Sequence, residues 1–86
     1  LYKLDLSCNK LKNIYKDTFS GLINLVKLDL RSNQIDSIEI DSFKNMNKLV
    51  EIDLSYNKLK NIYKDTFSGL INLEELDLRR NQIESI

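Results

Sequence analysis

The chain has 86 residues, which is enough for one small domain. Thirteen Lys and Arg residues balance thirteen Asp and Glu residues, so we expect no long-range attraction to nucleic acid or to an anionic membrane. No segment approaches the roughly 20 consecutive apolar residues of a membrane span. Leu1 opens directly into patterned sequence without a basic and apolar leader, so we expect no membrane insertion of these residues. Cys8 is the one cysteine, which excludes an internal disulfide and a pair of thiolate metal ligands.

Apolar residues and one asparagine recur with a period of 24 residues along the whole chain. In the first unit they are Leu1, Leu4, Leu6, Asn9, Leu11, Ile14, Phe19 and Leu22. The same residue types return at this spacing twice more, and a partial fourth unit ends on Ile86. An offset of 48 residues gives a closer match, because Lys10 to Leu25 repeats as Lys58 to Leu73 and 30 of 38 comparable positions are identical. The sequence therefore indicates duplication of a two-repeat unit.

Each unit begins with the pattern of a short strand. Leu4 and Leu6 alternate with Lys3, Asp5 and Ser7, and this period of two is typical of a strand with one buried face. Because the pattern returns in the same direction, we expect one strand per unit and parallel stacking about 4.8 Å apart. An asparagine follows each predicted strand, where its amide can donate to and accept from the turn backbone. We predict a structural ladder at these positions, with a polar binding column as the alternative: Asn9, Asn33, Asn57 and Asn81.

The second half of each unit is predicted to turn back with little regular structure. An acidic residue precedes each Thr-Phe or Ser-Phe pair and can cap a single helical or 3₁₀ turn. These residues are Asp17, Asp41 and Asp65. The next column contains residue types that tolerate positive φ, namely Gly21, Asn45 and Gly69. The phenylalanines are expected to form a buried spine rather than an aromatic binding stripe; they are Phe19, Phe43 and Phe67.

The spacing L-x-x-L-x-L-x-x-N-x-L, with Phe and Leu further along each unit, resembles the leucine-rich repeat and in particular its 24-residue variety. The resemblance covers the whole chain. It implies an α/β solenoid with a concave parallel β-sheet, one short strand per repeat, and short helical or 3₁₀ turns on the convex side. We therefore divide residues 1–86, a single leucine-rich repeat fragment without terminal caps, into repeats 1–24, 25–48 and 49–72 and a partial repeat 73–86.

The residues that most catalytic sites require are missing. The chain has no histidine, which is the commonest general base near neutral pH. No serine lies in a G-x-S-x-G turn, and two separate glycines cannot build a phosphate-binding loop. We expect no enzymatic activity and no cofactor. Cys8 shares its column with Ser32, Tyr56 and Arg80, so we interpret it as a variable exposed position, with a reactive thiol as the alternative.

An aspartate occupies the outward strand position of every unit, at Asp5, Asp29, Asp53 and Asp77. Parallel strands in register would place these carboxylates about 5 Å apart in a line. Calcium is the alternative to a solvated surface, but calcium needs six to eight oxygens that converge on one point. Basic residues beside the line can neutralise it, and they are Lys3, Lys27, Arg31 and Arg79. We therefore expect a solvated, partly salt-bridged surface and no metal ion.

The outward strand positions are the surface left for a partner. We predict that the binding residues are Lys3, Asp5, Lys27, Asp29, Arg31, Glu51, Asp53, Tyr56, Glu75, Asp77, Arg79 and Arg80. Both signs of charge are interspersed, which suits a specific protein partner better than a polyanion, so we expect no nucleic-acid ligand. Tyr56 and the arginines are the expected anchors, because Tyr and Arg are enriched at binding hot spots.

The resemblance also implies a function and a compartment. Leucine-rich repeats of this length are similar to those of extracellular receptors, adhesion proteins and matrix proteins, which implies a protein-recognition module outside the cell or at its surface. The chain has no N-x-S or N-x-T acceptor and no cysteine-rich cap. The alternative is a structural spacer or a cytoplasmic scaffold, in which the repeats set a distance and neighbouring domains bind.

Overall fold

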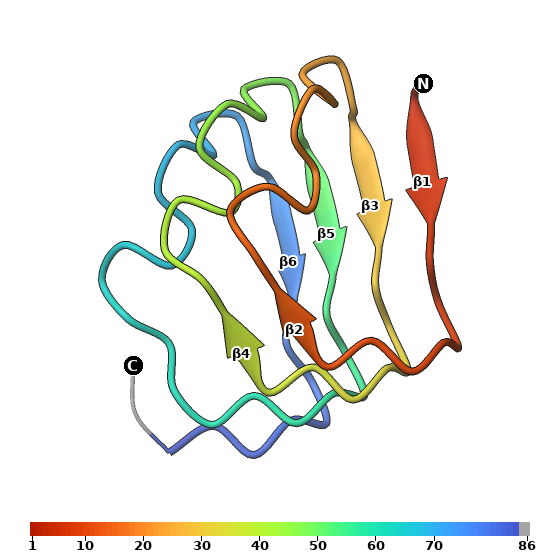
Figure 1. Ribbon diagram of the computed structural model, residues 1–86, viewed down its shortest axis with the longest axis vertical. Helices are drawn as coiled ribbons and strands as arrows, with labels where there is room; N and C mark the ends of the chain where they lie inside the picture. The colour runs from red at the N-terminus through yellow and green to blue at the C-terminus, as the bar shows by residue number, and fades with distance from the viewer. Residues whose placement is uncertain (85–86) are drawn as a thin grey trace.

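The computed structural model describes residues 1–84 and has the predicted solenoid architecture (Figure 1). Four short parallel strands form one sheet in the order β1-β3-β5-β6. They are β1 (Lys3–Asp5), β3 (Lys27–Asp29), β5 (Glu51–Asp53) and β6 (Glu75–Asp77). Leu4, Leu28, Ile52 and Leu76 align across the four strands, so the 24-residue period of the sequence is the register of the sheet. The predicted strand of every repeat is confirmed, whereas Ile86 lies outside the described residues.

A second parallel pair, which the sequence did not predict, lies in another layer of the coil (Figure 1). It consists of β2 (Asn13–Ile14) and β4 (Ser37–Ile38). Hydrogen bonds between repeats continue on both sides of it, for example from the amide of Gln34 to the carbonyl of Leu11 at 2.8 Å. Two-residue strands are too short to show a period of two, so only the stacking of neighbouring repeats reveals them.

The apolar columns form one continuous core between the two sheets. Leu28, Leu30, Ile52 and Leu54 are at most 2% exposed. The predicted phenylalanine spine is confirmed, because the rings of Phe19, Phe43 and Phe67 stack with centroids 6.2 and 5.9 Å apart. Burial decreases toward the edge of the sheet. Leu76 of β6 is 37% exposed while its neighbour in register, Ile52, is 0% exposed, because β6 has a paired strand on one side and β5 has one on each side.

The turns opposite the four-stranded sheet contain 3₁₀-type hydrogen bonds without a continuous helix in the part of the chain that the structure describes. In the first repeat the amide of Thr18 donates to the carbonyl of Tyr15 at 3.0 Å, and two further bonds with the same spacing follow. The predicted cap at Asp17 is wrong. The side-chain acceptor is Thr18, whose Oγ1 accepts from the amide of Tyr15 at 2.8 Å, because a side chain at this position reaches back across the turn. The same bond, at 2.9 Å, joins Thr66 to Tyr63.

Positive φ angles follow the prediction in part. Gly21 and Gly69 have φ values of 87° and 96°, but Asn45 does not share them, and in its repeat Asp41 takes the left-handed conformation at 68°. A second left-handed column was missed. Its members are Cys8, Ser32, Tyr56 and Arg80, with φ between 57° and 60°. The amides of the first three donate to a carbonyl of the next repeat at 3.0 to 3.1 Å, so pairing between repeats fixes this unusual backbone.

Candidate binding surface on the sheet

The asparagine ladder holds the strand ends in place. Nδ2 of Asn57 donates to the carbonyls of Leu30 and Leu54, both at 3.0 Å, and Oδ1 accepts from the amide of Ile35 at 3.0 Å. Asn33 and Asn81 repeat this arrangement. Each of these asparagines therefore joins its own turn to the preceding repeat. The predicted ladder is confirmed, and it joins the strand ends of neighbouring repeats beneath the outer surface of the sheet.

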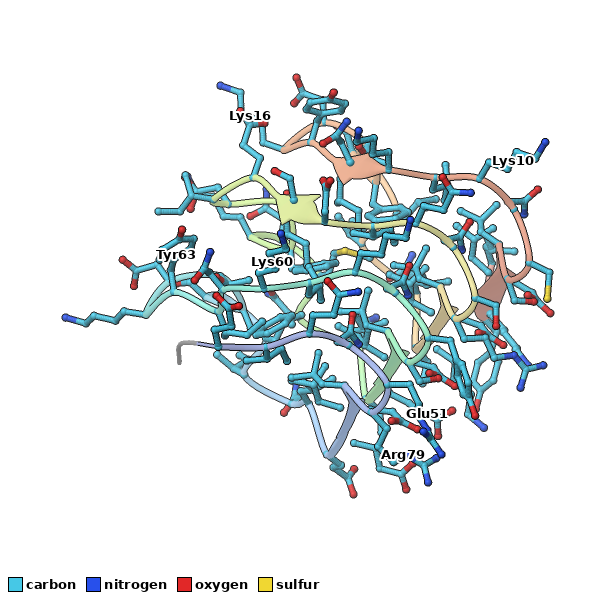
Figure 2. All side chains as sticks on the ribbon, turned by 90° about the horizontal axis from the view of Figure 1, so that it is seen from below. Lys10, Lys16, Glu51, Lys60, Tyr63 and Arg79 are labelled. Carbon is cyan, nitrogen blue, oxygen red and sulfur yellow. The ribbon has the colours of Figure 1, made fainter. Side chains whose placement is uncertain are left out.

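Two rows of charged side chains cross the outer surface of the four-stranded sheet, which we call the strand face. The first positions of the strands form the charge row, Lys3, Lys27, Glu51 and Glu75. The third positions form the aspartate row, Asp5, Asp29, Asp53 and Asp77. Figure 2 shows Glu51 and Arg79 on the side of the strands, and Lys16 and Tyr63 on the opposite side of the coil. The predicted binding residues of all four repeats therefore lie along one side of the solenoid.

The aspartate row is bonded to the turns of the same chain. In every repeat Oδ1 of the aspartate accepts from the backbone amide two residues later, at distances between 2.9 and 3.2 Å. In the described residues the ion pairs are Arg31 with Asp29 at 3.5 Å and Arg79 with Asp77 at 2.8 Å. Lys3 and Lys27 form no ion pair with the row in these residues, although the charge of Lys3 contributes to the lowered pKa of Asp5. Within residues 1–84 no group of three or more His, Cys, Asp or Glu residues is arranged to hold a metal ion.

These bonds shift the acidity of two members of the row. The hydroxyl and backbone amide of Ser7 lower the pKa of Asp5 below its ordinary value of 3.8. Hydrogen bonds from the Arg79 side chain, followed by its amide, lower the pKa of Asp77 and in turn raise the pKa of Arg79. Arg79 is therefore committed to Asp77, which it contacts with Nε and Nη2. It is a weaker candidate anchor than the sequence indicated.

Tyr56 lies in the turn after β5, in the left-handed column that also contains Arg80. Tyr56 is 58% exposed, so an aromatic side chain is available beside the two charged rows. Cys8 occupies the equivalent position after β1 and is exposed, as expected. The residue types of this column gave no signal for a positive φ, because Tyr and Arg do not favour it.

Two shallow hollows lie on the strand face and adjoin at Glu51 and Asp53. One hollow of about 230 Å³ is bordered by Lys3, Lys27, Asp29, Arg31, Glu51 and Asp53. The other, of about 490 Å³, is bordered by Glu51, Asp53, Glu74, Glu75, Asp77 and Arg79. Together they are bordered by most of the predicted binding residues, whereas Asp5, Tyr56 and Arg80 lie outside them.

The two halves of the duplication differ almost only on this side of the molecule. Asn9 to Leu25, which includes the turn opposite the sheet, is identical to Asn57 to Leu73. The eight differing pairs are Tyr2/Val50, Lys3/Glu51, Leu4/Ile52, Cys8/Tyr56, Val26/Glu74, Lys27/Glu75, Ser32/Arg80 and Asp36/Glu84. Seven of them lie in a strand, directly before it or in the turn after it, and the eighth exchanges one acid for another. The strand face is therefore the part of the surface that distinguishes one copy from the other.

These features define a repeat solenoid with a rigid sheet and a variable outer surface. The chain belongs to the leucine-rich repeat family, whose model matches residues 1–59 and 23–83. It is similar to the crystal structure of a TLR13–ssRNA13 complex, with 37% sequence identity and a TM-score of 0.90, covering 94% of this chain and 11% of that chain. A search of curated proteins found no match. Members of this family are typically non-enzymatic recognition modules. No helix in residues 1–84 is long and apolar enough to cross a membrane.

Proposed function

We propose that this chain is a protein-recognition module that binds a protein partner on its strand face. The observation that carries the proposal is the distribution of differences between the two copies, because the identical residues maintain the solenoid and the differing residues lie beside or on the strands. A surface that only had to maintain the fold would have no need of different charges in the two copies. Membership of the leucine-rich repeat family supports a recognition role.

The exposed side chains favour protein over nucleic acid. Seven acidic residues lie on or directly beside the four strands, in the two rows and at Glu74, against five basic ones. Nucleic acid binding depends on neutralising phosphates with Lys and Arg, and this excess of carboxylates opposes it. The similar TLR13 structure is an RNA complex, but it shares 37% of aligned residues and this chain spans 11% of its length. Tyr56 and Arg31 are the proposed anchors, because both are more than half exposed and Arg31 makes only a 3.5 Å contact with Asp29.

We further propose a receptor, adhesion or matrix-type protein located outside the cell or at its surface. The similarity to TLR13 and the 24-residue repeats support this proposal. The alternative is a structural spacer or cytoplasmic scaffold, which the identity of Asn9–Leu25 and Asn57–Leu73 favours, because unchanged turns fit a role in setting distance. Staining of an epitope-tagged protein on intact and permeabilised cells separates the two. Signal on intact cells supports the extracellular proposal, and signal only after permeabilisation contradicts it.

A photo-crosslinking experiment tests the binding face. The chain offers a matched pair of exposed tyrosines, Tyr56 at 58% exposure beside the strands and Tyr63 at 69% on the opposite side (Figure 2). Each is replaced in turn by a photoreactive phenylalanine analogue. We expect a specific protein adduct from position 56 and none from position 63. The captured protein is then titrated in purified form against Tyr56→Ala, Arg31→Ala and the opposite-side control Lys16→Ala.

The expected result is a loss of about thirtyfold in affinity for a hot-spot variant and little change for the control. If position 63 captures the partner and Lys16→Ala weakens binding while Tyr56→Ala and Arg31→Ala do not, the partner binds the turns and the proposal is wrong. Tyr56 has a positive φ, and alanine keeps the Cβ atom that makes this conformation unfavourable. The backbone strain is therefore the same in Tyr56→Ala, and a change in affinity reports the loss of the aromatic ring.

A further inference from the structure

We infer that the partner presents a bipolar segment to the strand face, with acidic side chains over β1 and β3 and basic side chains over β5 and β6. This inference rests on the proposed function and specifies the chemistry of its ligand. It begins with the order of the charge row, which is Lys3, Lys27, Glu51 and Glu75 across the four strands. Adjacent strands are about 4.8 Å apart, so the two basic and the two acidic positions are centred about 10 Å from each other.

The charge row has no ion-pair partner within the described part of the chain, where Lys27 Nζ lies over the Tyr2 ring, 6.0 Å from its centroid. Its four side chains form no ion pair within 4.0 Å there, and both ion pairs in residues 1–84 belong to the aspartate row and its arginines. The register also places Lys3 beside Lys27 and Glu51 beside Glu75. Like charges directly opposite on neighbouring strands destabilise a sheet. The register also pairs Lys27 with Glu51, so two like-charge pairs stand against one opposite-charge pair, and a partner with the opposite charges would relieve the repulsion within the like-charge pairs.

The two hollows differ in charge in the same direction as the two halves of the charge row. The hollow over β1, β3 and β5 is lined by three bases and three acids, so its charges balance: Lys3, Lys27, Arg31, Asp29, Glu51 and Asp53. The hollow over β5 and β6 contains an additional acid, Glu74, and its single arginine, Arg79, is already paired with Asp77 at 2.8 Å. The lining thus changes from balanced charge in the first hollow to an excess of acid in the second.

The change of sign is a difference between two otherwise similar copies. Lys3 corresponds to Glu51 and Lys27 corresponds to Glu75, so both lysines of the first copy are replaced by glutamate in the second. Val26 corresponds to Glu74, which adds a third acid to the second copy. The aspartate row, which is bonded to the turns, is the same in both copies. The aspartates therefore have the same structural contacts in both copies, whereas the reversal changes side chains that make no such contacts.

A second copy of this chain is a poorer occupant than a different protein. Pairing the charge rows of two copies face to face, with Lys3 opposite Glu75, would bring their aspartate rows against each other. Carboxylates in register across such an interface repel each other, which disfavours this pairing. A segment of another protein can carry acids and bases at the charge row without placing acids at the aspartate row.

A random peptide library displayed on phage serves as the probe, selected against the folded chain and a charge-swapped variant. The variant carries Lys3→Glu, Lys27→Glu, Glu51→Lys and Glu75→Lys, which leaves the net charge unchanged. The matched control reverses four exposed charges on the opposite side, with Lys16→Glu, Lys64→Glu, Asp17→Lys and Asp65→Lys. We expect peptides selected on the original chain to contain acidic and basic residues in separate halves. Their affinity should fall at least tenfold on the charge-swapped variant and stay within twofold on the control.

Three results would overturn the inference. Selected peptides without separated charges, or an equal affinity for the charge-swapped variant, would show that the polarity of the charge row does not matter. Self-association of the original chain that disappears in the charge-swapped variant would identify a second copy as the occupant. The variant Tyr56→Ala distinguishes failure of the charge inference from failure of the proposed function. If the peptides lose affinity with Tyr56→Ala but lack separated charges, the strand face is still the binding surface and only the charge inference is wrong. If only the opposite-side control weakens the peptides, both the charge inference and the proposed function are wrong.

Discussion

Replacing Asn57 with alanine is expected to lower the free energy of unfolding by about 1 to 3 kcal/mol. Asn57 is 5% exposed and its Oδ1 is the acceptor for the buried amide of Ile35 at 3.0 Å. That amide loses its partner in the variant. The carbonyls of Leu30 and Leu54 lose one donor each but keep another from the neighbouring asparagines, at 3.0 and 2.9 Å, so they contribute less. The unsatisfied amide therefore sets the size of the effect.

Asn9 provides the matched control for this prediction. It is exposed, and its Nδ2 donates only within its own turn, to the carbonyls of Leu6 and Ser7 at 2.9 and 3.1 Å. Asn9→Ala should therefore cost about 0.5 to 1 kcal/mol. Urea unfolding followed by circular dichroism measures both variants. Asn57→Leu should not restore stability, because a larger apolar side chain provides no acceptor for the amide. Equal midpoints for the Asn9 and Asn57 variants, or a stable Asn57→Leu, would refute the role of the ladder between repeats.

Gly21 and Gly69 both have positive φ, so replacing Gly21 with alanine should lower the free energy of unfolding by about 1 kcal/mol. Gly69→Ala should lower it by about 2 kcal/mol or more, because the new Cβ would lie 2.6 Å from the carbonyl oxygen of Lys44. Equal urea midpoints would contradict this. Ser7→Ala should raise the pKa of Asp5 toward 3.8 in an NMR titration, with the β6 aspartate unchanged as the control. The pKa of Asp5 in the folded chain lies below 3.8, so the ionised carboxylate stabilises the fold above pH 3.8. This stabilisation is lost as the pH falls through the folded pKa. In Ser7→Ala the decrease in stability on acidification should be smaller. Calorimetric titration with calcium should give no stoichiometric heat at micromolar concentration, because each carboxylate of the aspartate row bonds its own turn. A stoichiometric signal that vanishes when the two central aspartates become asparagine would show that the row binds the ion.

The sequence predicts the strands and the core of this protein because a repeat removes ambiguity. A single pattern such as Leu4-Asp5-Leu6 is weak, but the same pattern in register four times fixes the strand, its buried side and its parallel partners. The phenylalanine spine and the asparagine ladder follow in the same way, because one residue type in one column of every repeat has a common structural role. The candidate binding residues follow by elimination, and their role in binding remains a prediction.

The sequence by itself determined the period, the strand positions and the residues committed to the core. Only the tertiary structure decided how the remaining polar groups are satisfied. The left-handed column shows this, because the amide of Tyr56 donates to the carbonyl of Arg79 in the next repeat at 3.0 Å. Apolar burial follows from residue type and spacing, whereas a hydrogen bond depends on the position and direction of its partner. A hydrogen-bond partner that lies in the next repeat therefore cannot be predicted from the local sequence.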